Sequence, residues 1–248
     1  MEVHSHTHTP RKKWTHYFWE FLMLFLAVFC GFLAEYKLEH VIEHQREKQY
    51  MISMIKDLES DTTSLNEGFP RKDGRIKAID SLFDYFSAHP GTNKIPGYVY
   101  RLMARATWDR SYDRNSVTFN QLKNSGGMRL IRRSIVADSL SSYDHAWERS
   151  DFWRQFYREQ QKAIVEFMGA IINDNSLLTW YRNNTSHNPV ANIPDSISIE
   201  INTAQLLPLL NYLSRQKSYT LQDKENYQKI SVKAARLIEL IKKEYHLK

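Results

Sequence analysis

The sequence is poor in the residues that cross-link or interrupt a fold. Cys30 is the one cysteine among 248 residues, so no disulfide can form within the chain, and cysteine usage does not identify the compartment. Glycine (8) and proline (7) are scarce, which disfavours a turn-rich β-sandwich and favours long helices. The net charge of +6 is spread along the chain without a long basic run or a recognition motif. Composition therefore predicts an all-α protein and gives no support to nucleic-acid binding.

One long hydrophobic run, YFWEFLMLFLAVFCGFLA at residues 17–34, departs from this polar background. Glu20 is its only charged residue. Counted from Trp14 to Leu33, helical residues at about 1.5 Å each span about 30 Å, which is the hydrocarbon thickness of a bilayer. The mean hydropathy of the whole chain, −0.56, leaves room for a single membrane-spanning segment. We therefore predict one transmembrane helix at residues 14–34, with the lipid bilayer as a partner.

Two processing alternatives and one functional alternative concern this run. Cleavage after Ala34 would place the bulky Phe32 where signal peptidase needs a small residue, and lipoprotein processing at Cys30 would need a small residue in place of Phe29. An acidic residue inside a membrane is a functional candidate by default, but Glu20 lies about one and a half turns from Trp14, so its carboxylate can reach the headgroups. An uncleaved anchor with an interfacial Glu20 is the favoured interpretation.

The residues that flank the run predict its orientation. Basic residues 11–13 lie immediately before it, next to aromatic residues, whereas Lys37, Arg46 and Lys48 follow it at wider spacing. A tight basic cluster is typical of the cytoplasmic edge of a bilayer. We predict that residues 1–13, which are rich in histidine, form a disordered cytoplasmic tail, and that the rest of the chain lies on the other side.

The segment that follows, EYKLEHVIEHQREKQ at residues 35–49, is charged and contains nothing that breaks a helix, so it is predicted to be a helical stalk. Within it, His40, Glu43 and His44 match the H-x-x-E-H pattern of inverted zinc proteases, with two imidazoles one turn apart and a glutamate as general base. A solvated stalk without an evident third ligand is a poor place for such a site. We therefore assign no catalytic, cofactor-binding or metal residues and expect no cofactor; a metal-dependent hydrolase through these three residues remains the alternative.

Residues 50–248 are predicted to form a multi-helix bundle, because apolar residues recur there at helical spacing. Glu67 and Gly68, with Pro70 just beyond, indicate the end of the first of these helices. Pro96 is expected to open another helix. The predicted helices cover residues 50–67, 75–87, 95–106, 134–172 and 222–246, with a further short helix that starts at Thr203.

Three smaller patterns refine this prediction. Isoleucines alternate with polar residues at 197–201, which indicates one short strand without an evident partner. Ser125-Gly126-Gly127 is predicted to end a helix rather than to cradle a phosphate, because no strand precedes it. Phe152 and Tyr157 lie off the apolar stripe of the long helix, so that helix is expected to contact neighbours on two sides. The last helix has a basic outer face.

Three sets of residues together resemble a known family. They are the anchor with its aromatic opening and Glu20; the following helix with Arg46-Glu47 and Asp57-Leu58-Glu59-Ser60-Asp61-Thr62; and the run Thr118-Phe119…Leu122…Ser125-Gly126-Gly127…Leu130-Ile131. Over residues 14–145 the chain resembles an uncharacterised family of small single-pass bacterial membrane proteins, a domain of unknown function. The resemblance implies a topology and a helical fold, but no activity and no catalytic residues.

The sequence thus predicts a membrane-anchored structural or interaction module, such as a subunit of a cell-envelope assembly, with a protein partner or a second copy of itself. Its expected location is the bacterial inner membrane, with the N-terminus in the cytoplasm and the C-terminal domain in the periplasm. The alternative is a membrane-anchored hydrolase. A buried cluster of polar side chains in a concave pocket would favour that alternative.

Overall fold

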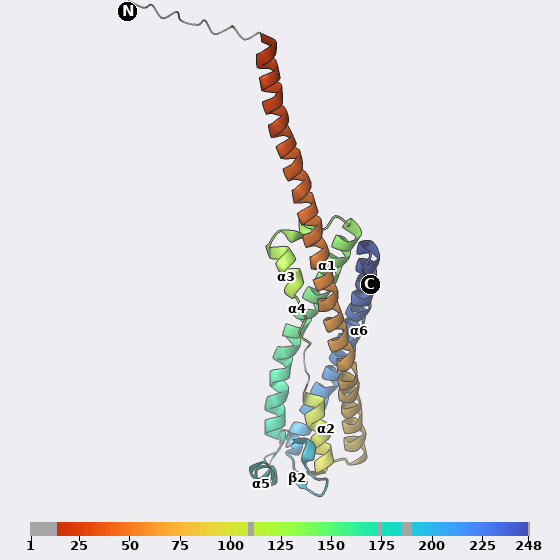
Figure 1. The fold of residues 1–248 in the computed structure, drawn as a ribbon. Helices are drawn as coiled ribbons and strands as arrows, with labels where there is room; N and C mark the ends of the chain where they lie inside the picture. Colours follow the sequence, from red (N-terminus) through yellow and green to blue (C-terminus); the bar gives the residue numbers. More distant parts are fainter. Residues whose placement is uncertain (1–13, 109–111, 173–174, 185–189, 248) are drawn as a thin grey trace, which may run out of the picture. The chain divides into compact units, whose positions relative to one another are not determined.

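The computed structural model describes residues 14–108, 112–172, 175–184 and 190–247 (Figure 1). The structure is 84% helical with almost no strand, and the all-α fold predicted from the sequence is confirmed. The predicted tail at residues 1–13 lies outside the described residues. The elements in chain order are α1 (Trp14–Ala88), β1 (Lys94–Pro96), α2 (Gly97–Thr107), α3 (Val117–Asn124), η1 (Gly127–Leu130), α4 (Ser134–Ile171), α5 (Ser176–Asn183), η2 (Val190–Asn192), β2 (Ser198–Glu200), η3 (Thr203–Gln205) and α6 (Leu206–Tyr245).

The chain divides into two compact units, Met1–Tyr50 and Met51–Lys248, and α1 contributes residues to both. In the first unit, α1 contains an 18-residue window of mean hydropathy 2.0, none of which is buried inside the protein. By length and composition, this is the one helix among the described residues that can cross a membrane. Stacked phenylalanines run along it, with ring centroids 6.2 Å apart for Phe21 and Phe25 and 5.9 Å apart for Phe25 and Phe29.

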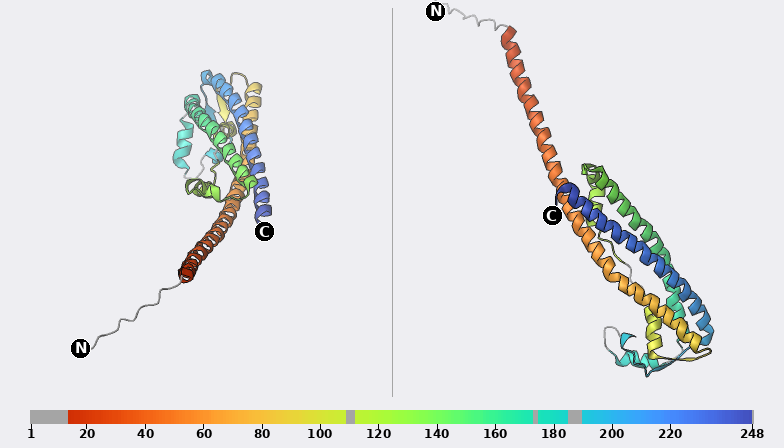
Figure 2. Two further views of the ribbon diagram at one scale, coloured as in Figure 1. Left: turned by 90° about the horizontal axis from the view of Figure 1, so that it is seen from above. Right: turned by 90° about the vertical axis from the view of Figure 1, so that its right-hand side faces the viewer.

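In the second unit, α4 and α6 run antiparallel and side by side, and residues 51–88 of α1 lie beside them (Figures 1 and 2). The apolar stripes of these helices form the core. Each leucine or isoleucine that is fully removed from water contributes about 1.5–3 kcal/mol to stability. The core positions with at most 1% exposure include Met51, Leu58, Leu65, Ile79, Leu82, Leu140, Trp147, Tyr227 and Ile241.

A second apolar cluster lies where the short elements gather, near the end of α1. Strand β2 occurs where the alternating isoleucines predicted a strand, and its partner is β1, in antiparallel register with Ile95 opposite Ile199. Both of these isoleucines are buried, with exposures of 1% and 0%. The sequence-based prediction began a helix at Ile95; instead, β1 ends at Pro96, and α2 begins at the next residue.

Two predicted helix boundaries are wrong. Helix α1 continues through Gly68 and Pro70 to Ala88, and the separate helices expected at 203 and 222 are one helix, α6. Pro70 is exposed, and the burial of Leu65 before it and Ile79 after it holds the helix together around the missing hydrogen bond. Pro208 lies in the first turn of α6, where the backbone N–H groups have no helical partner in any case.

The glycine pair after α3 behaves as expected. Gly126 has a φ of 68°, a left-handed conformation that suits glycine, and the chain then turns into η1. Ile131, just beyond η1, is 7% exposed. The interpretation of this run as the end of a short helix, and not as a phosphate loop, agrees with the structure.

Candidate functional site

Two aspartates on α1, the half-buried Asp57 and the buried Asp61, organise one end of the second unit. The Asp57 carboxylate accepts a hydrogen bond from the backbone N–H of Thr118 at 2.8 Å, and the Asp61 carboxylate accepts one from the N–H of Asn115 at 2.6 Å. The Tyr143 hydroxyl donates to the second oxygen of Asp61 at 2.6 Å. Two stretches that stood out in the sequence, residues 57–62 and 118–131, therefore meet in space. The Asp57 carboxylate thus satisfies the N–H group of Thr118 in the first turn of α3, where the Ser116 side chain forms no capping hydrogen bond.

Burial governs the ionisation of this cluster. Asp61 is 3% exposed, and loss of water raises its pKa above the ordinary value of 3.8, although the hydrogen bonds from Tyr143 and Asn115 act in the opposite direction. Burial also raises the pKa of Tyr143, and the negative charge of Asp61 adds to this effect. The tyrosine therefore remains a neutral hydrogen-bond donor to the carboxylate.

The raised pKa of Asp61 predicts a pH dependence of stability. The folded protein binds the carboxyl proton of Asp61 more tightly than the unfolded chain does. The free energy of unfolding should therefore rise as pH falls from neutral through the raised pKa, and it should level off near pH 3.8. Urea unfolding of the full chain in detergent micelles, measured between neutral pH and about pH 4, should show wild type gaining stability relative to Asp61→Asn. A difference between the two proteins that does not change with pH would contradict this prediction.

A buried ion pair joins α1 to α6. The Lys72 ammonium donates to Asp223 at 2.5 Å, and it lies 5.3 Å and 5.5 Å from the ring centroids of Tyr112 and Tyr227. Lys72 is 2% exposed, so water contributes little to holding its charge. Burial raises the pKa of Tyr227, and the nearby Asp223 carboxylate raises it further. This cluster locks two helices together, and we assign it a structural role.

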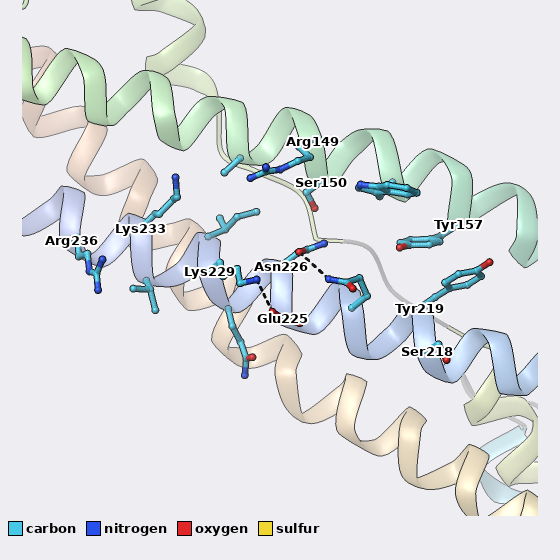
Figure 3. A pocket seen from close by; sticks show the side chains of 16 residues that line it. Arg149, Ser150, Tyr157, Ser218, Tyr219, Glu225, Asn226, Lys229, Lys233 and Arg236 are labelled. Atoms are coloured by element: carbon cyan, nitrogen blue, oxygen red, sulfur yellow. Dashed lines mark hydrogen bonds and ion pairs between the residues drawn. The ribbon is translucent and has the colours of Figure 1, made fainter.

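A groove of about 1080 Å³ lies between α4 and α6 in the second unit (Figure 3). Its α4 wall carries Arg149, Ser150, Trp153 and Tyr157, and its α6 wall runs from residue 218 to residue 236. Ser150 is 3% exposed. Its hydroxyl lies close enough to Tyr227 to lower the pKa of that tyrosine, yet it makes no hydrogen bond of ordinary geometry within the described part of the chain. The lining of the groove thus includes a buried hydroxyl close to Tyr227.

The charge of this groove is positive. Among its lining residues, Arg149, Lys229, Lys233 and Arg236 are basic and Glu225 alone is acidic, which gives four positive charges against one negative, a net of +3. Glu225 binds Lys229 at 2.6 Å, and Lys233 donates to the Ser142 hydroxyl at 2.8 Å. Arg149 and Arg236 form no ion pair with the residues that the structure describes. Two guanidinium groups are therefore available to an incoming anion.

Aromatic residues line the other end of the groove. The rings of Trp153 and Tyr157 stack with centroids 6.4 Å apart, and Tyr157 contacts Tyr219 across the groove at 4.9 Å. Trp153 keeps 43% of its surface exposed. Figure 3 shows Tyr157 and Tyr219 at one end and Arg236 and Lys233 at the other. The groove thus offers both apolar contact and positive charge.

The zinc-protease pattern in the stalk gains no support. His40 lies 3.9 Å from Glu43, and His44 lies 3.3 Å from Glu47, so each imidazole faces the acid three residues further along. Within the described ranges, no group of three His, Cys, Asp or Glu side chains is placed to hold a metal ion. The described residues therefore provide no third ligand for a hydrolase that uses His40, Glu43 and His44.

Sequence reasoning did not find the groove, although two of its signals were present. The basic face of the last helix supplies one wall, and Tyr157, an aromatic residue off the apolar stripe of α4, lies on the other. Comparisons with protein-family models, with curated proteins and with solved structures gave no match. The function of this protein is therefore inferred from the residues of this chain.

Proposed function

We propose that this protein is a single-pass membrane protein whose helical domain, residues 51–248, serves as an interaction module in a cell-envelope assembly. The observation that carries the proposal is the 18-residue window of α1, with a mean hydropathy of 2.0 and no part buried inside the protein. An apolar surface of this size is costly in water, at about 25 cal/mol for each Å² exposed, and it is stable in a lipid bilayer.

The domain adds support for a binding role. Its polar interior joins helix to helix through short contacts, such as Lys72 with Asp223 at 2.5 Å and Tyr143 with Asp61 at 2.6 Å, which suits a rigid scaffold. The α4–α6 groove, in contrast, retains exposed aromatic and basic side chains. Aromatic residues and arginines are the side chains most enriched at protein interfaces.

Anchoring predicts a result from fractionation. The full chain should stay with the membranes after an alkaline carbonate wash, because the apolar window is held by lipid. A variant that lacks residues 14–34 should move to the soluble fraction while remaining helical by circular dichroism. Release of the full chain by carbonate would refute the anchor.

The proposed orientation has the N-terminus in the cytoplasm and the domain in the periplasm of a bacterial inner membrane. It rests on the tight basic cluster at residues 11–13, which is typical of the cytoplasmic edge of a bilayer. Alkaline phosphatase fused after Lys248 should be active, and green fluorescent protein at the same place should be dark. The reverse pattern would place the domain in the cytoplasm.

The interaction itself is tested by purification of the full chain from its native membranes in a mild detergent. A second protein, present in a constant ratio and retained through size-exclusion chromatography, is the expected result. Recovery of a monomer alone, from membranes in which the chain is at its native level, would argue against an interaction module.

A further inference from the structure

We propose that the groove between α4 and α6 binds an amphipathic helix of a partner protein, one whose polar face is acidic. This inference rests on the proposed function, for which it specifies the binding site and the chemistry of the partner.

The length and shape of the groove suit a helix. At 1.5 Å per residue, its α6 wall from Ser218 to Arg236 is about 27 Å long, or five helical turns, and its α4 wall from Ala146 to Tyr157 is about 17 Å long, or three turns. The two walls are antiparallel helices, so the space between them is a straight trough into which a third helix can pack its side-chain ridges. A small metabolite would occupy only one end of it.

The charge of the groove selects an acidic helix. The lining carries a net charge of +3, and Arg149 and Arg236 lack ion-pair partners among the described residues. They belong to opposite walls, so acidic side chains on the incoming helix can reach both. Guanidinium groups bind carboxylates with paired hydrogen bonds. These bonds attract the carboxylate and also fix its orientation.

The apolar residues of the groove supply the other half of the recognition. Trp153 is 43% exposed and Val232 is 49% exposed, although both line the groove. Large apolar side chains on one face of the incoming helix would cover these two residues, while its acidic residues meet the arginines. Tryptophan and arginine are the residues that most often dominate binding energy at an interface.

Two other occupants fit less well. An anionic lipid headgroup would engage the basic end but leave Tyr157 and Tyr219 at the other end without contact (Figure 3), together with Trp153, which stacks on Tyr157. A nucleic-acid strand needs a row of cations along its backbone, whereas Lys229 is paired with Glu225 and the groove lining from Ser218 to Gln222 contains no cation. The observations favour a protein helix over both.

Site-directed photo-crosslinking in native membranes tests the inference with the full chain. A photoreactive phenylalanine analogue replaces Val232 in the groove or, as the control, Leu221; both lie on α6 with 49% exposure, and Leu221 does not line the groove. We expect the probe at 232 to crosslink another protein. The crosslinked peptide, identified by mass spectrometry, should be a helical segment with acidic residues on its polar face. The probe at 221 should give no such product.

A charge-reversal pair then tests the role of the arginines. Arg149→Glu combined with Arg236→Glu should lower the crosslinking yield at 232 by at least about tenfold, because two attractive charge pairs become repulsive. Arg129→Glu combined with Arg182→Glu makes the same change of charge at exposed positions outside the groove, and should leave the yield within about twofold. Circular dichroism of both double variants checks that the domain is folded.

Several outcomes would overturn the inference. In the crosslinking experiment, these are no crosslink at 232, or a crosslink there to a second copy of this chain, to lipid alone, or to a segment that is basic or not helical. In the charge-reversal experiment, the contradicting outcome is an equal loss of crosslinking yield in both double variants. Failure here is separable from failure of the proposed function. If a partner still co-purifies and crosslinks at 221 but not at 232, the interaction module stands and the groove is not its site.

Discussion

Replacement of Asp223 by leucine should lower the free energy of unfolding by about 3–5 kcal/mol, the largest effect that we expect from a single substitution in this chain. The reason is the lysine that would remain. Lys72 is 2% exposed and donates to Asp223 at 2.5 Å, so the variant would take the Asp223 carboxylate away from a buried ammonium. The rings of Tyr112 and Tyr227 lie near that ammonium, but they cannot replace a negative charge.

The reverse substitution should cost less. In Lys72→Met the remaining carboxylate belongs to Asp223, whose side chain is 12% exposed and can turn toward water. Lys72→Met combined with Asp223→Leu should recover much of the lost stability, because a well-packed apolar pair avoids the desolvation of both ions. The measurement is urea unfolding of the full chain in detergent micelles, followed by far-UV circular dichroism.

A surface pair on α6 provides the matched control. Lys229 and Glu225 also form an ion pair, at 2.6 Å, but their side chains are 65% and 56% exposed. Lys229→Met should therefore cost about 0.5 kcal/mol or less. If Asp223→Leu costs no more than this control, the ion pair between Lys72 and Asp223 does not hold α1 and α6 together.

The parts of this fold that the sequence predicts are those that local chemistry determines. Scarce glycine and proline and a 3.6-residue apolar period were sufficient to predict the helical class and the long helix α4, Ser134–Ile171. The strand near Ile199 was predicted by its alternation. Its partner, β1, was not, because Lys94–Pro96 is three residues long and shows no period.

The parts that the sequence did not predict depend on contacts between distant segments. Lys72 and Asp223 are 151 positions apart, and nothing local marks either as one half of a buried pair. The groove is similar. Basic residues on α6 are visible in the sequence, but their position opposite Arg149 and Trp153 follows only from the antiparallel packing of α4 against α6. Proximity in the fold, and not residue type, makes these residues a candidate site.

Gly68 shows how a local rule can mislead, and it leads to the second large prediction. By the local rules of helix ends, Gly68 beside Pro70 should end a helix. In the structure, Gly68 lies within α1, and the ring of Tyr112 lies directly against it. A Cβ atom on Gly68 would lie 1.9 Å from Cε1 of that ring. Tyr112 is 5% exposed and packs edge-on against Tyr227, at 4.6 Å between centroids, so the ring has little room to move.

We therefore expect Gly68→Ala to lower the free energy of unfolding by about 1–3 kcal/mol, as overpacked cores do. Gly169 is the matched control, since it also lies in a helix, α4, but an added Cβ would meet nothing within 4 Å. Gly169→Ala should raise the free energy of unfolding by about 0.5–1 kcal/mol, because alanine is the better helix former.

Gly68→Ala in a Tyr112→Ala background distinguishes a clash with the Tyr112 ring from an effect on the backbone of α1. Without the ring, the three atoms nearest to an added Cβ are absent, and Gly68→Ala should become neutral or stabilising, like Gly169→Ala. A coupling of more than about 1 kcal/mol between positions 68 and 112 is the expected result of this double-mutant cycle. If Gly68→Ala instead destabilises the protein equally in both backgrounds, the cause lies in the backbone of α1, and the close approach of Tyr112 is not what requires a glycine there.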